Sequence, residues 1–234
     1  MSSENSHLLQ EVLCAFVFNP SANTWDSTYF GKYFEAIQDL GFKDKQEQKG
    51  VEVKLEFKVD QKPESSYNDV EAKMPFKNVE KNRAIIMANS YISFHKLAPY
   101  ERWENMMSDQ IVPGLDRYFK IGLGKELLQV QMLYLNRYEL SDNEKLSERF
   151  SFIPSIEDFG IGKEKNLFLQ SQYDLEPNLL MQIQITARLT EKNTKEVFLQ
   201  CSCTGNNQNQ KMSWEEIAKQ VHDQNNIVFN KITK

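Results

Sequence analysis

The sequence predicts an α+β fold built around a mostly antiparallel sheet. Apolar and polar residues alternate over several short segments, which is typical of strands, and apolar residues recur every three or four positions over others, which is typical of helices. Their order gives two strand–helix–strand units, a three-stranded meander and a C-terminal helix packed on the sheet. A chain of 234 residues, 40% of them hydrophobic, can bury this core as one domain, with sub-units over residues 8–59, 83–140 and 164–234.

The first unit begins with a continuous apolar strand from Leu8 to Phe18. Aromatic and aliphatic residues at helical spacing then predict a helix over residues 28–40, with Asp26 or Ser27 as its N-cap. The segment from Val51 to Val59 alternates strictly between apolar and charged residues. This alternation predicts a strand with one face in water.

The second unit follows a polar connector over residues 60–82, in which we expect at most a short element around Phe76. The segment from Arg83 to Leu97 is too long for one typical strand, so we expect a tight hairpin that turns at Asn89 and Ser90. The second unit therefore opens with two paired strands.

A long helix is predicted after this hairpin. Pro99 suits the first turn of a helix, and the apolar positions from Trp103 onward fall four residues apart. Pro113 removes a backbone donor inside this helix, so we expect a kink or an interruption there. A strand from Leu127 to Leu140 completes the second unit.

The last third of the chain predicts a meander and a helix. Three strands are predicted over Leu167–Leu175, Leu179–Leu189 and Glu196–Cys203. Ser213 and Glu216 then have the spacing of a capping box, which predicts the start of a helix whose apolar stripe ends near Ile232.

The composition bounds the class of protein. A net charge of -5 and a pI near 5.4 disfavour a nucleic-acid-binding surface, because such binding grows with the number of Lys and Arg residues set against phosphates. No run reaches the roughly 20 apolar residues that a membrane-crossing helix needs, and the first residues have no signal-peptide pattern. We therefore expect a cytoplasmic protein without a membrane partner.

The cysteines offer little chemistry. Cys201 and Cys203 would share one face of a strand and could form half of a metal site, but no pair of histidines is spaced to supply further ligands. Cys14 lies within an apolar strand. We expect buried thiols, with no metal and no cofactor.

Several segments, in order along the chain, resemble one protein family. They are Glu11-Val-Leu-Cys-Ala-Phe-Val-Phe18, Trp25-Asp26 followed by Gly31, Leu97-Ala-Pro-Tyr-Glu-Arg-Trp103, Tyr134-Leu-Asn-Arg137, Phe152-Ile-Pro154 and the segment from His222 to Phe229. The chain is similar to a sporadically distributed family of conserved hypothetical prokaryotic proteins of about this length, which shows Lys-Pro-Tyr-x-x-Trp at a helix start and Tyr-Ile-Asn-Arg in a strand. Ala98 and Leu135 depart from that pattern. The resemblance implies a full-length prokaryotic unit and assigns no catalytic residue.

One pattern suggests catalysis. An acid followed by Glu-x-Lys on a strand is the arrangement by which some nucleases bind a divalent metal and polarise a phosphate, and Asp44, Glu52 and Lys54 fit it. The same residues fit a strand that keeps its outer face wet, since Glu56 and Lys58 continue the alternation. The wet strand face is the favoured interpretation.

Two other polar residues, Arg137 and His95, are candidate site residues. Arg137 lies at the end of an apolar strand, where it can bind a phosphate or carboxylate ligand, or instead pair with Glu139 or an acid of the next connector. His95 lies two residues after Ser93, but a nucleophile and a base also need a third orienting group. We expect an ion-paired arginine and a histidine at the surface or at a sheet edge.

The three tryptophans each stand near a predicted helix start, at Trp25, Trp103 and Trp214. An indole in such a position most often packs a helix on a sheet, and a base-stacking platform would need basic neighbours that are largely missing. We therefore expect three packing contacts between helix and sheet.

These observations favour a binding or assembly protein over an enzyme. The sequence lacks a complete catalytic constellation and contains several strand edges that need covering. We expect it to act through a protein partner or as a homo-oligomer, as a subunit of a prokaryotic multi-component system. A metal-dependent nuclease or phosphoesterase is the alternative, and a chaperone-like sheet that holds an extended peptide is a third hypothesis.

Overall fold

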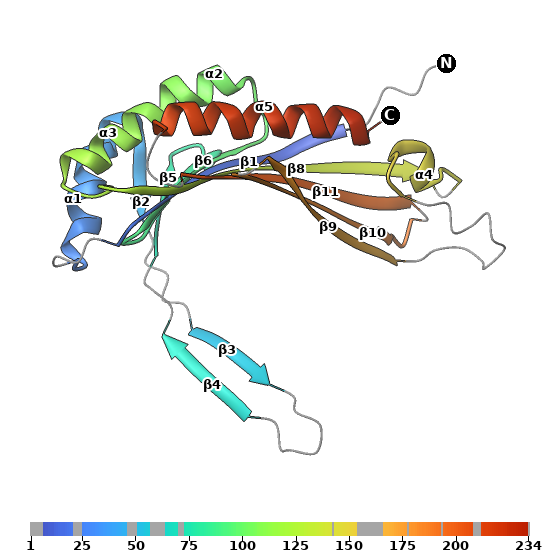
Figure 1. The fold of residues 1–234 in the computed structure, drawn as a ribbon, viewed down its shortest axis with the longest axis horizontal. Coiled ribbons are helices and arrows are strands. Elements are labelled where there is room, and N and C mark those ends of the chain that lie inside the picture. The colour runs from blue at the N-terminus through green and yellow to red at the C-terminus, as the bar shows by residue number, and fades with distance from the viewer. Residues whose placement is uncertain are drawn as a thin grey trace.

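A large antiparallel sheet carries helices on one face. The computed structural model describes residues 7–20, 25–45, 51–56, 64–69, 73–141, 143–153, 166–176, 178–192, 194–207 and 212–233. Nine strands form one antiparallel sheet, and the longer helices lie together on one side of it (Figure 1). The α+β class, the antiparallel sheet and the C-terminal helix packed on it are therefore as predicted.

The first half of the sheet leaves the central strand and returns to it. β1 (His7–Phe18) is followed by α1 (Thr28–Ile37), the short helix η1 (Gln38–Leu40) and the edge strand β2 (Phe42–Lys45). A meander of β5 (Met74–Asn78), β6 (Arg83–Met87) and β7 (Tyr91–Leu97) then returns to pair with β1. The helical segment after it consists of α2 (Trp103–Met106), the π-helical η2 (Met107–Ile111) and α3 (Val112–Lys120).

The second half follows the same path. β8 (Leu127–Ser141) leads through α4 (Leu146–Arg149) to the opposite edge strand β9 (Asn166–Glu176). β10 (Leu179–Leu189) and β11 (Thr194–Asn206) return to β8, and α5 (Trp214–Ile232) follows them. The meander and the final helix were predicted, with boundaries within a few residues.

The two halves join through the pairing of β1 with β8. Val12 lies opposite Tyr134 in this antiparallel pair, and the full order is β2-β5-β6-β7-β1-β8-β11-β10-β9. β8 therefore opens the second half of the sheet. The predicted division into two strand–helix–strand units is not confirmed by this layout.

A second, two-stranded sheet is formed by β3 (Val51–Glu56) and β4 (Glu64–Asp69). Figure 1 draws this hairpin apart from the nine-stranded sheet, on the side away from the helices. β4 was not predicted, because its polar composition hides the strand, and residues 57–59 of the predicted strand lie outside the described residues. The short element expected around Phe76 is β5, a full member of the large sheet.

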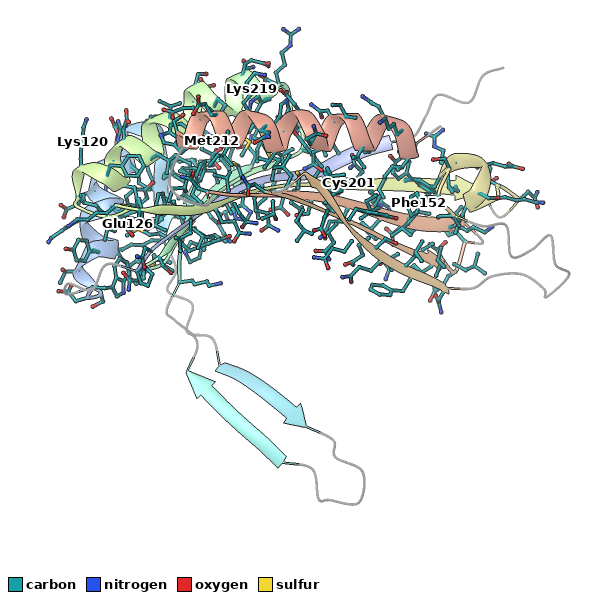
Figure 2. All side chains as sticks on the ribbon, in the orientation of Figure 1. Lys120, Glu126, Phe152, Cys201, Met212 and Lys219 are labelled. Atoms are coloured by element: carbon teal, nitrogen blue, oxygen red, sulfur yellow. The ribbon has the colours of Figure 1, made fainter. Side chains whose placement is uncertain are left out.

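The core fills the layer between the helices and the sheet (Figure 2). Alternate residues of β8, among them Val130, Met132 and Tyr134, are buried on its helix-facing side. Phe16 of β1 is fully buried and makes edge-to-face contacts with Phe94 of β7 and Trp214 of α5, at centroid distances of 6.0 and 5.7 Å. The helices of both halves therefore share one core.

Helix starts differ from the predictions at two places. Pro99 is not in the first helical turn, because Arg102 is extended and α2 begins only at Trp103. Ser27 occupies the N-cap position of α1 without a side-chain hydrogen bond, and the Asp26 Oδ1 accepts one from the Thr28 backbone N–H at 2.7 Å.

The interruption expected near Pro113 is present. The π-helical η2 separates α2 from α3, and Pro113, the second residue of α3, has no N–H to donate to the turn before it. The long helix is therefore two α-helical segments joined by a π turn.

α5 is fixed at its start and near its middle. Both hydrogen bonds of the predicted capping box between Ser213 and Glu216 are present. Farther along, the fully buried Asn225 donates from Nδ2 to the Met132 carbonyl oxygen of β8 at 2.8 Å. No helix within the described ranges is long and apolar enough to cross a membrane.

Candidate functional site

The residues of the nuclease hypothesis belong to two different sheets. Asp44 is an exposed residue of β2 and pairs with Lys77 at the edge of the large sheet. Glu52 and Lys54 lie on β3, which pairs with β4. The side chains of β3 lie outside the described part of the structure, so the geometry of this carboxylate–lysine pair stays a prediction.

Arg137 forms an ion pair across the sheet. Its Nε donates to the Glu196 Oε1 of β11 at 2.8 Å, and Arg188 of β10 binds the other oxygen of the same carboxylate. Hydrogen bonds from Arg188 and then Arg137 lower the pKa of Glu196. The partner of Arg137 is thus an acid on the neighbouring strand rather than Glu139, and its binding of a ligand stays a prediction.

Ser93, His95 and Glu11 have the connectivity of a catalytic triad. The Ser93 Oγ lies 2.8 Å from the His95 Nε2, and the His95 Nδ1 lies 2.6 Å from the Glu11 Oε1. With Glu11 as the acceptor, the His95 Nδ1–H donates to it, and in that tautomer Nε2 accepts from the serine hydroxyl. Glu11 is the third orienting group that the sequence reasoning missed.

This triad has no room for a substrate. Ser93 is 0% exposed and lies inside β7, paired with Ala15 on one side and Ile86 on the other. Its backbone N–H is committed to a regular ladder, whereas acyl transfer needs free donors aimed at the developing oxyanion. The histidine is also not at a sheet edge, because β7 lies between β6 and β1.

The cysteines are buried thiols. Cys201 and Cys203 lie on the helix-facing side of β11, where Figure 2 labels Cys201 beneath α5. Burial raises the pKa of each to about 12, which keeps both protonated. Within the described ranges, no group of three or more His, Cys, Asp or Glu residues is placed to hold a metal ion.

A pocket of about 300 Å³ lies where α2, α5 and the β1–β8 pair meet. Three of its lining residues, Trp103, Tyr134 and Asn136, are buried. Leu9 of β1 and Phe229 of α5 also line it. The pocket therefore draws on both halves of the sheet and on the helices that follow them.

His222 of α5 organises this pocket. Its ring stacks on the Trp103 indole at a centroid distance of 4.8 Å and an interplanar angle of 12°. The Nδ1 lies 2.6 Å from the Tyr134 Oη, and the Nε2 lies 3.0 Å from the Asn226 Nδ2. An amide nitrogen only donates, so Nε2 is the acceptor and the neutral ring donates from Nδ1 to the tyrosine oxygen.

The interior of the pocket is uncharged at neutral pH. Burial lowers the pKa of His222 below 6.5, so that its ring is neutral. Burial also raises the pKa of Tyr100 and of Tyr134 above the usual value of a phenol. The charged groups, Arg102 and Glu104, are exposed and stand at the rim.

The tryptophans only partly follow the prediction. Trp214 packs α5 on β1 through Phe16, as expected. Trp103 instead joins α2 to His222 of α5, and Trp25 stacks on Tyr29 of the following helix α1 at a centroid distance of 5.4 Å. The sequence did not predict the pocket, because Trp103 was expected to contact the sheet and not a second helix.

Weak signals for the pocket exist in the sequence. His222 and Asn226 are four residues apart on a helix, and Tyr134 and Asn136 are two apart on a strand, so each pair shares a face. Nothing local shows that the two faces meet.

The two edges of the large sheet differ. β2 has four residues, and its exposed positions are Lys43, Asp44 and Lys45. β9 has 11 residues and contains no Lys, Arg or Pro. It exposes Phe168 at 64% and Tyr173 at 46% of their surface. Short length and lysine are devices that keep an edge from pairing with another strand, and β9 has neither.

Comparison with known proteins adds no family to this description. A scan against models of protein families finds no match, and a search of curated proteins finds no similar sequence.

Proposed function

We propose that the protein is a binding and assembly protein that pairs with a second copy of itself along β9. The long edge of β9, which contains no Lys, Arg or Pro, is the observation that supports this function. The outer side of an edge strand presents unpaired N–H and C=O groups, and a second strand satisfies them. A two-fold pair of sheets suits a subunit of a larger prokaryotic assembly.

The sequence of β9 is compatible with self-pairing about a two-fold axis at Ser171. In this register, Leu169 lies opposite Tyr173 and Leu167 opposite Leu175 of the other copy. Gln170 then faces Gln172. These pairs match apolar with apolar and amide with amide, whereas Phe168 faces Asp174 and Asn166 faces Glu176. Such cross-strand pairs are the unit of sheet stabilisation.

A cysteine at the axis tests this register. Facing Cα atoms of an antiparallel pair are about 4.5–5.5 Å apart, within disulfide reach. Ser171→Cys should form a covalent dimer under mild oxidation, seen on a non-reducing gel. The native cysteines are buried and do not compete. Val79→Cys, at a position 69% exposed and outside β9, is the control, and equal cross-linking of both variants would contradict the register.

Charge on the edge tests the association itself. Wild type should sediment as a dimer. The double variant Gln170→Lys with Gln172→Lys, which sets lysine opposite lysine in this register, should sediment as a folded monomer with an unchanged circular dichroism spectrum. Val79→Lys should remain a dimer. A wild-type monomer at every concentration would overturn the proposal, and binding of extended apolar peptides by that monomer would support the peptide-holding hypothesis instead.

The nuclease alternative has its own test. Glu52→Ala with Lys54→Ala should abolish any Mg²⁺- or Mn²⁺-dependent cleavage of nucleic acid that the wild type shows. A wild type that cleaves nothing removes this alternative.

A further inference from the structure

We propose that the pocket between α2, α5 and the β1–β8 pair binds a neutral, planar heteroaromatic compound of nucleobase size. This site is separate from the β9 edge, because none of its lining residues belongs to β9 or β10. The inference rests on the size of the pocket, its aromatic lining, its hydrogen-bonding groups and its lack of internal charge.

The size and the lining select a flat ring. About 300 Å³ is at the lower end of the range for small-molecule pockets, so the ligand has one or two rings rather than a long chain. Trp103 and His222 are nearly parallel, and Tyr100 packs edge-on against Tyr134 at 6.4 Å. Flat rings with π-faces stack on aromatic side chains of this kind.

The polar groups select a ring with heteroatoms at its edge. The buried Asn136 amide carries both donors and an acceptor, and the Tyr134 hydroxyl lies beside it on the same strand face. The Tyr134 Oη accepts from the His222 Nδ1, so its own O–H can donate to a ligand. A purely hydrocarbon ligand offers no acceptor for this donor, whereas a nucleobase edge carries acceptors as well as donors.

The charges select a neutral ligand. His222 and the tyrosines are uncharged at neutral pH, and the rim carries one positive and one negative side chain, Arg102 and Glu104. The phosphate of a nucleotide would lie near both a positive and a negative side chain at the rim, and no cationic side chain of the described residues lines the interior to bind it. A free base therefore fits better than a nucleotide.

The three tryptophans provide the readout. A ¹H–¹⁵N NMR spectrum contains one indole N–H signal for each of Trp25, Trp103 and Trp214, and Trp103→Phe identifies the pocket signal by its loss. Titration with adenine, guanine, cytosine and uracil should shift the Trp103 signal of the wild type with at least one base. The Trp25 and Trp214 signals, which lie outside the pocket, should stay in place.

A pair of tyrosine variants tests the hydrogen bond. Tyr134→Phe keeps the ring and removes the hydroxyl, so the Kd for the bound base should rise roughly three- to tenfold. Tyr138→Phe removes a hydroxyl from the same strand and face outside the pocket, and it should leave the Kd unchanged.

Four outcomes would overturn the proposal. They are no shift of the Trp103 signal with any of the four bases, equal shifts of all three indole signals, binding of indole as tight as that of the best base, and equal losses of affinity in the two tyrosine variants. Indole has two rings but no ring acceptor, so its equal affinity would show stacking without recognition of the edge.

Discussion

The two halves of the sheet follow one path and end differently. In each half, a central strand leads to the outer edge, a meander returns to the centre and a helical segment follows. The first half ends at the short β2 with its two lysines, and the second at the long β9, which contains no lysine. The same backbone path can therefore end in an edge strand that resists pairing or in one that can pair with another strand.

The halves differ at their edges but are joined in the core, and the substitution with the largest expected effect tests that junction. Phe16→Ala removes a ring that contacts β7 of the first half and α5 of the second. We expect a loss of about 3–5 kcal/mol of unfolding free energy in a single transition, measured by urea denaturation. Phe168→Ala, which removes an exposed ring, should change the unfolding free energy by less than about 0.5 kcal/mol. Two separate transitions in the wild type would show that the halves fold independently.

Close packing of helix on sheet in the second half can be tested next. A Cβ at Gly205 of β11 would lie 2.7 Å from the Ile217 Cγ2 of α5, so Gly205→Ala should lower the unfolding free energy by about 1–3 kcal/mol. Gly31 of α1 in the first half has open space around it, and Gly31→Ala should raise stability by up to about 1 kcal/mol. Equal effects of the two variants would contradict this difference between the halves.

The seam between the halves should respond to pH through His222. Its pKa in the folded protein is below 6.5, so the unfolded state binds the proton more readily and stability falls as pH drops through that value. Melting temperatures between about pH 7.5 and about pH 5.5 should therefore fall more steeply for wild type than for His222→Gln. Parallel curves would show that the histidine is not held neutral by its stack on Trp103.

The smallest expected effect belongs to the ion pairs of the second half. The pKa of Glu196 is lowered in the folded state, so its contribution exists above the ordinary carboxylate pKa and is lost as pH falls below it. Both arginine partners are more than one-third exposed, so Glu196→Gln should reduce stability at neutral pH by at most about 1 kcal/mol. The difference from wild type in denaturant titrations should shrink as the pH falls below the ordinary carboxylate pKa, and a difference that does not change with pH would contradict the ion-pair explanation.

Local patterns predicted most elements of this fold. Alternation located β10 and β11, and the spacing of Ser213 and Glu216 located the start of α5, because strand faces and helix caps depend on neighbouring residues. The pairing of β1 with β8 could not be predicted in the same way. It joins residues such as Val12 and Tyr134 that are far apart in sequence, and many apolar strands are equally compatible with such a partner.

The candidate sites depended on the same kind of long-range pairing. Glu11 reaches His95 across 84 positions, and the pocket joins residues of β1, α2, β8 and α5. The edge of β9 was predicted as a strand, but the sequence does not show which strand is outermost. Residue type alone indicated the chemistry of each group, and the sheet order decided which groups meet.

The hydrogen bond of Asn225 to β8 fixes the position of α5 along the sheet. An apolar helix face could slide along apolar strands with little change in buried area. A slide of one turn, about 5.4 Å, would however break the hydrogen bond from the Asn225 amide to the Met132 carbonyl oxygen and leave the buried amide unpaired. His222 is one turn before Asn225 on the same helix. A single hydrogen bond outside the pocket therefore sets where the imidazole stands over Trp103, and a change at Asn225 would alter the pocket without removing any group that lines it.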